Sequence, residues 1–411
     1  MSGLTLWAAL AWRNIRRNRR RSLLTILLIA VGALALLLSL GYMAASFAGI
    51  KFGIIQGGTG HLQIAQADEF ADHAMRPLEY ALTPAQGIAL AQLVDEDARV
   101  RRIVPRLLFQ GLISNGERSE IFTGTGVEPS AEWSAFGRGF SIEAGEFLPA
   151  APAERFSVLL GRRLAEKLNA RIGDTLTLLV AAATGSVNAV DVKLAGTLQT
   201  GSAEQDSFVL FMPLRATQEL MRSDKVSRYA VLLREPDAEQ ALRQTINQRF
   251  PELQTKNWQE LAPIYDQIVR MYRDLFSVLG VIILLLIFMA VLNTIMMNVF
   301  ERSREIGTMR AVGIPARWVR GLFILEGSLL GALGGAAGGL LSFLISTAIR
   351  FSGITTPPPP GRTLGNALVI AWDWRFIVAA LLVMSLLGGL AAWFASRHVT
   401  RLQVLDALNA G

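Results

Sequence analysis

The chain has 411 residues, of which 52% are hydrophobic and only 18% are charged, a composition too apolar for a typical soluble protein. Its formal net charge of +7 does not indicate a nucleic-acid partner, because the basic residues gather beside apolar runs and no DNA- or RNA-binding motif accompanies them. The absence of cysteine excludes disulfides, thiolate nucleophiles and cysteine-ligated metals.

The segment 1–22 is predicted to be an amphipathic helix with a basic flank on the cytoplasmic side. Its apolar residues recur at helical spacing opposite arginines, and they are Leu4, Trp7, Ala8, Ala11 and Ile15. A helix of this kind lies in the plane of the membrane interface, with tryptophan at headgroup level. A basic flank that does no more than set the topology explains the pattern equally well.

Four apolar runs are long enough to cross a bilayer, which takes about 20 residues. They cover 23–50, 275–300, 321–349 and 376–396. The first run is much longer than the hydrophobic region of a signal peptide, about 7–15 residues, and it is therefore predicted to be retained as a span.

Arginine placement predicts the orientation of these spans. Basic residues cluster before the first span, within 301–320 and after the fourth span, whereas 51–274 has more acidic than basic residues. Because Lys and Arg are enriched on the cytoplasmic side, both termini and the 301–320 loop are predicted to be cytoplasmic, and 51–274 is predicted to be exported. We therefore expect a multi-pass protein in the lipid bilayer of the cell inner membrane.

Between the first and second spans, residues 51–260 are predicted to form a large extracytoplasmic α+β domain. Segment 59–66 alternates like a strand, and 84–95 and 237–250 have helical patterns. The stretch 117–213 is richer in turns and short strands. The predicted fold is an α-helical membrane protein with four transmembrane helices and an α+β domain, in which two flanking halves hold an inserted, mostly β subdomain.

Residues 261–300 are predicted to form a stalk that continues into the second span. Apolar side chains recur there at alternating spacings of three and four, as in a heptad repeat, at Leu261, Ile264, Ile268, Met271 and Leu275. This seam is expected to pack on the extension of the first span or on a partner subunit. Ordinary core packing of one amphipathic helix is the alternative.

The stretch Glu301–Gly327 interrupts the apolar runs with a dense set of arginines. Its first part, 301–320, is predicted to hold a short cytoplasmic helix that ends at Pro315, because proline lacks the N–H that an interior turn needs. One face of this helix is predicted to be apolar and consists of Ile306, Met309, Val312 and Gly313. A short charged helix between two spans is well placed to be moved by a partner in the aqueous phase.

The third span, 321–349, is rich in glycine. Glycines at every fourth position let helices approach closely, within the chain or between subunits, and they are Gly327, Gly331, Gly335 and Gly339. Glu326 is an intramembrane acid near the cytoplasmic end of this span and hence a functional candidate. Pairing with Arg320, or extension to the interface, would also explain it. Residues 350–375 are predicted to form a Pro-rich exterior loop and 397–411 a cytoplasmic tail.

The sequence carries no motif that would make it an enzyme. None of its lysines follows a glycine, so these residues contain no G-x-x-x-x-G-K-[ST] loop for ATP. There is no H-E-x-x-H or G-x-S-x-G motif, and the histidines are scattered. We therefore expect no catalytic site, metal site or cofactor in this chain.

The topology and four motifs resemble the MacB/LolC/FtsX family of ABC transporter permeases. The motifs are the basic amphipathic segment Ala11–Thr25 (AWRNIRRNRRRSLLT), the coupling segment Arg302–Gly313 (RSREIGTMRAVG), the helix, turn and strand of Leu164–Leu178 (LAEKLNARIGDTLTL) and the tail Ser396–Asn409 (SRHVTRLQVLDALN). The coupling segment is the most specific. In layout the chain is most similar to the lipoprotein-releasing LolC/LolE type. The turn Thr184–Asn188 is one candidate for the hook that recruits a periplasmic carrier in that type, and a plain surface turn is the alternative.

The resemblance implies a homo- or heterodimer of permease subunits, each seated on a separate cytoplasmic ABC ATPase that binds ATP and Mg. The ATPase-contact residues that it indicates are Glu301, Arg302, Arg304, Glu305, Gly307 and Arg310, and a solvated loop that only sets topology is the alternative. It further implies mechanotransmission, in which ATP hydrolysis drives work outside the membrane, here the release or export of lipoprotein or lipid. The alternative functions are an FtsX-like transducer that controls an exterior enzyme or senses a peptide, and a MacB-like efflux of peptide or drug.

Overall fold

The computed structural model describes residues 3–17, 19–72, 78–149, 155–355 and 367–399. The chain divides into two compact units. The membrane unit comprises Met1–Phe47, Ile268–Ile354 and Ala367–Gly411, and the αβ unit comprises Ala48–Gln267 and Thr355–Asn366. The prolines of the predicted Pro-rich loop and most of the motif in the C-terminal tail lie outside the described residues.

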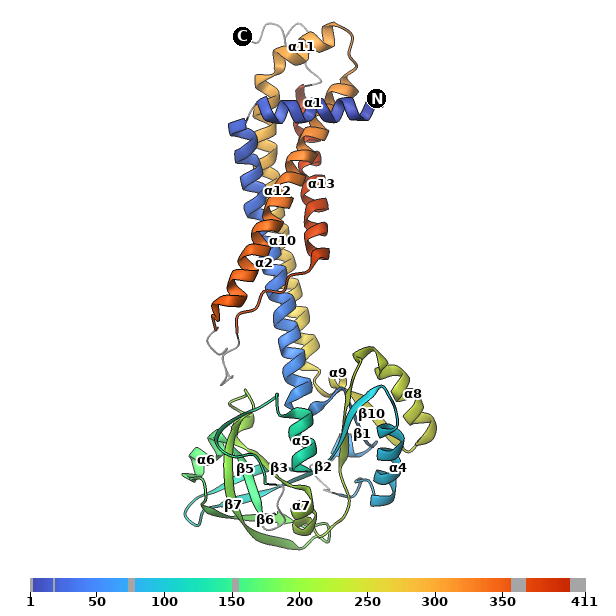
Figure 1. The fold of residues 1–411 in the computed structure, drawn as a ribbon, viewed down its shortest axis with the longest axis vertical. Coiled ribbons are helices and arrows are strands. Elements are labelled where there is room, and N and C mark those ends of the chain that lie inside the picture. The colour runs from blue at the N-terminus through green and yellow to red at the C-terminus, as the bar shows by residue number, and fades with distance from the viewer. Residues whose placement is uncertain (1–2, 18, 73–77, 150–154, 356–366, 400–411) are drawn as a thin grey trace. The chain divides into compact units, whose positions relative to one another are not determined.

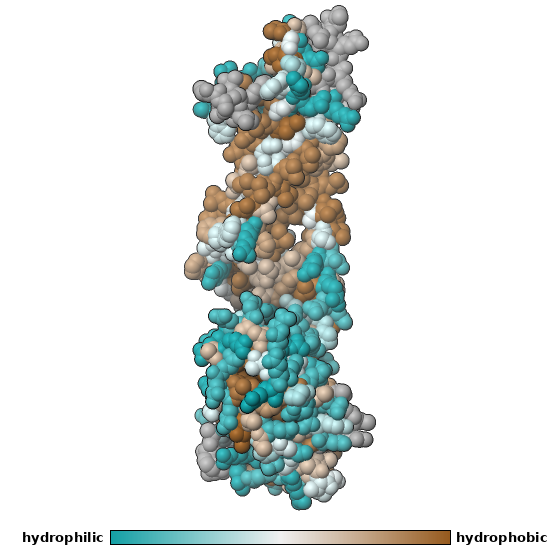
Figure 2. Space-filling model, turned by 90° about the vertical axis from the view of Figure 1, so that its right-hand side faces the viewer, coloured by the Kyte–Doolittle hydropathy of each residue, from teal (hydrophilic) through white to brown (hydrophobic). Residues whose placement is uncertain are grey.

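The membrane unit is a bundle of long helices (Figure 1). Its helices are α1 (Gly3–Arg17), α2 (Arg19–Ile54), α10 (Ile264–Glu301), α11 (Ser303–Ala311), α12 (Ala316–Ser352) and α13 (Trp374–Val399). Of these, α2, α10, α12 and α13 are long and apolar enough to cross a membrane, which confirms the four predicted spans. Figure 2 shows a broad hydrophobic surface over the long helices, as expected for side chains that face lipid.

The four long helices share one apolar core. Its members include Ile29, Ala33, Ile287, Val291, Phe323, Met384 and Ala391. Helix α1 instead crosses the end of the bundle and packs on α12 (Figure 1). Its Ala11 and Ile15 are buried while Trp12 is exposed, so α1 is amphipathic over its described side chains. The side chains of Leu4, Trp7 and Ala8 lie outside the described part of the chain.

The αβ unit combines one mixed sheet with short helices. Its strands are β1 (Leu62–Gln66), β2 (Val100–Ser114), β3 (Ser119–Val127), β4 (Ser141–Gly145), β5 (Ser157–Gly161), β6 (Thr175–Ala181), β7 (Val187–Gln199), β8 (Val209–Pro213), β9 (Arg228–Leu233) and β10 (Leu253–Asn257). Its α-helices are α3 (Glu69–Asp72), α4 (Pro84–Asp95), α5 (Pro129–Phe136), α6 (Arg162–Leu168), α7 (Leu214–Met221), α8 (Glu239–Arg249) and α9 (Trp258–Leu261). Shorter turns are η1 (Ile55–Thr59), η3 (Gln205–Ser207) and η4 (Pro236–Ala238). The predicted fold class is confirmed.

The long strand β2 belongs to both parts of the predicted domain. In one direction the sheet continues from β2 through β9 and β1 to β10. In the other, β2 pairs with β3, followed by β8, β5, β7 and β6, and β6 pairs with β2 again, so that these six strands close on themselves. The inserted β part therefore begins within β2 rather than at residue 117. The turn Thr184–Asn188 does lie at the β6–β7 hairpin.

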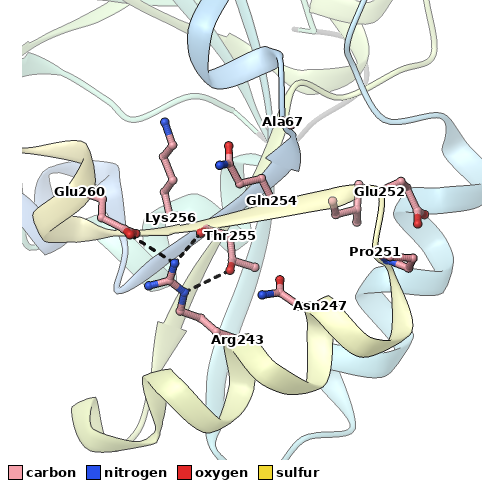
Figure 3. A pocket seen from close by; sticks show the side chains of 10 residues that line it. Ala67, Arg243, Asn247, Pro251, Glu252, Gln254, Thr255, Lys256 and Glu260 are labelled. Carbon is pink, nitrogen blue, oxygen red and sulfur yellow. Dashed lines mark hydrogen bonds and ion pairs between the residues drawn. The ribbon is translucent and has the colours of Figure 1, made fainter.

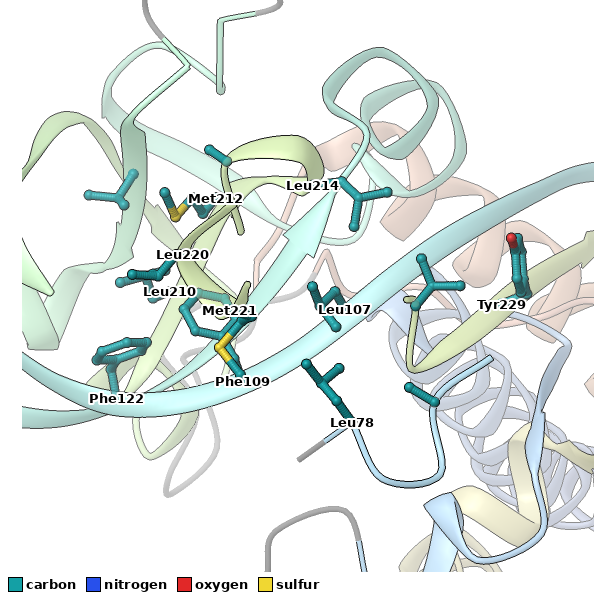
Figure 4. Close-up of a cluster of buried hydrophobic side chains, with 14 of the residues drawn as sticks. Leu78, Leu107, Phe109, Phe122, Leu210, Met212, Leu214, Leu220, Met221 and Tyr229 are labelled. Carbon is teal, nitrogen blue, oxygen red and sulfur yellow. The ribbon is translucent and has the colours of Figure 1, made fainter. Parts of the chain in front are cut away.

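The core of the αβ unit follows from the alternation of its strands. Leu107 and Phe109 of β2 and Phe122 of β3 point to the same buried side, and the two phenylalanine rings meet edge to face with centroids 5.4 Å apart (Figure 4). Fully burying each of these side chains contributes about 1.5–3 kcal/mol. This shared core explains why both halves of the sheet form one folding unit.

A proline separates the stalk from the short helix before it. Pro263 disfavours helical backbone at the preceding Ala262, so α9 ends at Leu261 and α10 begins at Ile264. The predicted seam is therefore not continuous, because Leu261 lies on a different helix from its other members.

Candidate coupling site

Helix α11 lies between α10 and α12 in the chain and is set off by two breaks. At the first, Arg302 leaves the helical conformation, with φ −100° and ψ 13°. At the second, Gly313 takes a positive φ of 95°, which favours glycine and ends a helix. The predicted end at Pro315 is therefore wrong, and Pro315 instead precedes the first turn of α12.

The predicted apolar stripe of α11 is buried only in part. Ile306 is buried and Met309 packs against the core of the bundle. The Val312 side chain, in contrast, is 84% exposed, because Val312 follows the last helical residue and no longer keeps the helical spacing. Gly313 next to it has open space around its Cα.

The two acidic residues that the family resemblance indicated for ATPase contact are paired within this chain. Glu305 Oε1 lies 2.6 Å from Arg17 Nη2, which joins α11 to the end of α1. Glu301 forms an ion pair with Arg21 in the first turn of α2. All four side chains are substantially exposed, and such pairs contribute about 0.2–1 kcal/mol each. They fix the positions of helix ends more than they stabilise the fold.

Arg302 is turned into the bundle. Its Nε donates a 3.0 Å hydrogen bond to Glu305 Oε2, and its Nη1 lies 3.5 Å from Glu326 Oε2 on α12. Its guanidinium also lies over the Phe323 ring, 5.7 Å from the centroid. The Arg302 and Glu326 side chains are only 12% and 11% exposed. No spacing in the sequence indicated this pair, since it depends on the break at Arg302.

One further contact completes this cluster. A side-chain hydrogen bond joins Asn14 of α1 to Glu326. Burial by itself would raise the pKa of Glu305, but the hydrogen bonds and charges of Arg302 and Arg17 outweigh it and hold the pKa below its ordinary value. Glu305 is therefore charged near neutral pH and keeps both arginines as partners.

The other predicted contact residues divide between interior and surface. Gly307 is buried, Arg310 is half-buried and Arg304 is exposed. Trp318, near the start of α12, is also exposed. The exposed side chains on α11 and in the segment that follows it thus include Arg304, Val312 and Trp318, one basic and two apolar.

The predicted packing glycines of α12 all face another helix of this chain. Gly327, Gly331, Gly335 and Gly339 lie against α13. At Gly331 a Cβ would collide with the carbonyl of Met384. Gly334 and Gly338 form a second face of α12, against α2. Close backbone contact of this kind fixes α12 between its two neighbours.

The remaining stalk seam is exposed. Ile264, Met271 and Leu275 each have more than half of their side chain accessible, and Ile268 is half-buried. Core packing within this chain, one of the alternatives for the seam, is therefore wrong for these three residues.

A buried arginine holds the end of α2 in the αβ unit. Arg106 on β2 pairs with Glu132 on α5 and donates a hydrogen bond to the Gly58 carbonyl, in the turn after α2. Its guanidinium lies over the Phe136 ring, 4.6 Å from the centroid. The Arg106 and Glu132 side chains are 9% and 0% exposed. No sequence motif marks this pair.

An aromatic contact joins the ends of the two long helices in the αβ unit. Lys51, near the end of α2, lies 5.3 Å from the centroid of the Trp258 ring. That ring meets Tyr265, at the start of α10, edge to face with centroids 4.8 Å apart. The backbone N–H of Trp258 donates a hydrogen bond to the His61 carbonyl before β1. Both helices therefore end on the same part of the αβ unit.

A polar cavity of about 600 Å³ lies between α8 and the edge strand β10 (Figure 3). Arg243 reaches across it and donates to Thr255 Oγ1 at 3.2 Å and to the Thr255 carbonyl at 3.0 Å, and it pairs with Glu260 at 3.3 Å. These bonds occupy part of an exposed strand edge, which protects it from pairing with another strand.

A second cavity, of about 310 Å³, is apolar and lies among α2, α10 and α13. Its lining includes Leu37, Leu40, Phe276, Gly280 and Val383. Within the described part of the chain, no group of three or more His, Asp or Glu residues is placed to hold a metal ion.

Two family models match the chain over most of its length. The MacB-like periplasmic core domain matches residues 22–249, and the FtsX-like permease C-terminal domain matches residues 277–404. The chain belongs to the MacB/LolC/FtsX-like family of ABC transporter permeases. This permease is a multi-pass inner-membrane protein whose αβ unit is of the periplasmic type. Membership of the family implies an ATPase partner and a second permease subunit.

Relatives of different types align with this permease. It is 21% identical to an uncharacterized ABC transporter permease of Methanocaldococcus jannaschii, over 97% of this chain and 96% of that protein. It is 25% identical to the lipoprotein-releasing system transmembrane protein LolC of Neisseria meningitidis serogroup B, over 81% of this chain and 80% of that protein. It is 22% identical to the macrolide export ATP-binding/permease protein MacB of Psychrobacter cryohalolentis, over 96% of this chain but only 58% of that protein.

Proposed function

We propose that this permease works by mechanotransmission, coupling ATP hydrolysis by a separate ATPase to work in the periplasm. The observation that carries the proposal is the length of two unbroken helices. Helices α2 and α10 have 36 and 38 residues, whereas a bilayer needs about 20. A helix that continues from a span into a folded unit moves with both, so it can carry motion without opening a path for a solute.

The element that receives motion from the ATPase is α11, which we place on the cytoplasmic side together with both termini. Helix α11, helix α1 and the first turn of α2 all carry arginines, and positive charge near spans favours the cytoplasmic side. Since Glu301 and Glu305 are paired within the chain, we assign the ATPase contact to the exposed residues Arg304, Val312 and Trp318. Val312 is apolar and 84% exposed, and a partner that covered it would remove this apolar surface from water. ATP and Mg would be bound by that partner.

Substitution of Val312 tests the ATPase contact. We expect Val312→Asp to lower the amount of ATPase that copurifies with the permease, because a carboxylate would be desolvated at the contact. Phe351→Asp is the matched control, since Phe351 is also 84% exposed but lies at the other end of α12. If Val312→Asp retains as much ATPase as the wild type, α11 is not the docking element.

The exposed face of α10 is the surface that we assign to the second permease subunit. Its apolar residues alternate with charged ones such as Arg273 and Asp274, which suits a protein partner better than lipid. The chain has no cysteine, so an introduced cysteine would be its single thiol and any cross-link would form there. Met271→Cys should cross-link to a second subunit, a copy of this chain or a related permease, whereas Arg273→Cys should not. Equal cross-linking at both positions would remove the assignment.

Lipoprotein or lipid is the cargo that we propose. A relative named for lipoprotein release aligns over most of this chain, and the apolar cavity among α2, α10 and α13 offers hydrocarbon-compatible space. Depletion of the permease should then leave lipid-anchored proteins in the inner membrane, as membrane proteomics would detect. An FtsX-like transducer predicts no such accumulation. A MacB-like efflux protein predicts increased sensitivity to an exported peptide or drug instead.

A further inference from the structure

We infer that Arg302 is a positioning residue that fixes α11 to both α1 and α12, so that the amphipathic N-terminal helix moves together with α11. The inference rests on the proposed function, in which α11 receives the motion of an ATPase. It assigns Arg302 a role inside the permease, in place of the ATPase contact indicated by the family motif.

The contacts around Arg302 form a closed ring through three helices. Arg17 of α1 bonds Glu305 of α11 at 2.6 Å, and Arg302 bonds the other oxygen of Glu305 at 3.0 Å. Arg302 also pairs with Glu326 of α12 at 3.5 Å, and Asn14 of α1 bonds Glu326. Because each carboxylate has two partners in the ring, loss of one contact weakens the others.

Burial decides which contact of the ring holds α11 in place. Arg17 and Glu305 are about half exposed, so their pair is screened by water and contributes little. Arg302 and Glu326 are nearly enclosed, so removing Arg302 leaves the Glu326 charge without compensation in a poorly solvated site. Removing Glu326 leaves Arg302 with Glu305 alone as its carboxylate partner. The order of α11 is therefore expected to depend on Arg302 above all.

The length of α11 strengthens this dependence. The helix has 9 residues, and isolated helices of fewer than about 12 residues are marginal in water. Arginine suits the position because its planar fork can meet two carboxylates at once while its face lies over Phe323. A lysine would offer a single charged point and could not meet Glu305 and Glu326 together.

The same contacts couple α1 to α11. Through Asn14 and Arg17 the ring includes the helix that crosses the end of the bundle. A displacement of α11 therefore displaces α1 as well, and the amphipathic helix becomes part of the moving input rather than a fixed topological flank.

Hydrogen exchange on the full-length permease in lipid nanodiscs, without any ATPase, tests the ring. We expect the amides of α11 to exchange at least about tenfold faster in Arg302→Gln and in Glu326→Gln than in the wild type, with faster exchange in α1 as well. The exchange rate of α11 in Arg302→Lys should lie between the rates in Arg302→Gln and in the wild type. Arg304→Gln is the matched control, since Arg304 is an exposed arginine of the same helix, and in the absence of an ATPase it should leave the exchange of α11 and α1 at the wild-type rate.

Amide exchange in the rest of the protein shows whether each variant is still folded. Amides of α13 and of the αβ unit should remain protected in every variant, and if Arg302→Gln does not fold, Glu326→Gln carries the same expectation. Unchanged exchange in α11 for the Arg302 and Glu326 variants, or an equal effect of Arg304→Gln, would overturn the inference.

A second readout separates positioning from stability. Reconstituted with the copurifying ATPase, Arg302→Gln should assemble and hydrolyse ATP but lose ATP-driven release of a lipid-anchored reporter protein, with partial rescue by Arg302→Lys. Wild-type release by Arg302→Gln would overturn the positioning role. Absence of any ATPase or of reporter release in the wild type would contradict the proposed function instead, and the exchange result would then decide the role of Arg302 alone.

Discussion

Arg21 pairs with Glu301, 280 residues further along the chain, and so ties the first turn of α2 to the last residue of α10. Both long helices are thereby joined at the end where α11 begins. The pair is exposed on both sides, which keeps its contribution to the free energy of unfolding below about 1 kcal/mol. The pair matters for the arrangement of the helices, because it holds the start of α2 beside the end of α10.

Charge reversal tests this relationship. We expect Glu301→Arg to lower ATP-driven reporter release severalfold through repulsion from Arg21, with little change in stability. The double variant Arg21→Glu, Glu301→Arg should restore release, as measured in proteoliposomes with the partner ATPase. Arg20→Glu, at the neighbouring exposed arginine, is the control. If Glu301 served the ATPase rather than Arg21, the double variant would not regain activity.

The glycine face of α12 makes a prediction about stability. Gly331→Ala should destabilise the membrane unit by about 1–3 kcal/mol, the usual cost of overpacking, because its Cβ would meet the Met384 carbonyl of α13. Gly321→Ala, in the same helix but with nothing within 4 Å, should be neutral or slightly stabilising. Thermal unfolding of the full chain in detergent compares the two variants. Equal effects would show that close packing at Gly331 does not limit stability.

The spans and some local elements could be predicted from the sequence because their causes are local. A bilayer demands an uninterrupted apolar helix, and all four were found. Helix α4 has the predicted bounds, since Thr83 caps it, Gln86 completes the capping box and Pro84 opens it. The double role of β2 was not predicted, because its partners β9 and β6 come from distant segments.

The candidate coupling site also has one feature that the sequence predicts and others that it does not. A short helix between the second and third spans could be predicted, since charge between two apolar runs is visible in the sequence. The partners of its residues could not, because Arg302 meets Glu326 only after the helix breaks at Arg302 and α12 packs beside it. Val312 was misplaced for the same reason, as helical spacing fails once Gly313 ends the helix.

The buried pair of Arg106 and Glu132 yields a stability prediction for the αβ unit. Arg106→Met alone leaves Glu132 buried without a partner and should cost about 3–5 kcal/mol. The double variant Arg106→Met, Glu132→Leu should recover most of that loss, since apolar side chains suit a site in which the two residues are 9% and 0% exposed. Denaturant unfolding of the full chain measures both. A double variant no better than the single one would mean that the bond to Gly58, and not the ion pair, dominates.

His61 predicts a pH dependence of the αβ unit. Its Nδ1 accepts a 3.2 Å hydrogen bond from the Leu233 N–H, which requires an unprotonated nitrogen. Burial lowers the pKa of His61, and the charge of Lys51 lowers it further below the ordinary value of 6.5. The unfolded chain therefore takes up a proton at a higher pH than the folded chain does. This contribution to stability is full above pH 6.5 and is lost as pH falls through the folded-state pKa.

Calorimetry of the full chain in detergent should detect this loss as a lower unfolding temperature at roughly pH 5.5 than at roughly pH 7.5. His61→Asn is the informative variant, because its Oδ1 can accept the same hydrogen bond but does not titrate. We expect its unfolding temperature to depend less on pH over this interval than that of the wild type. Identical pH profiles for the two proteins would show that His61 is not the titrating group, and would direct attention to a buried ionisable pair of this unit, Glu69 and Arg228.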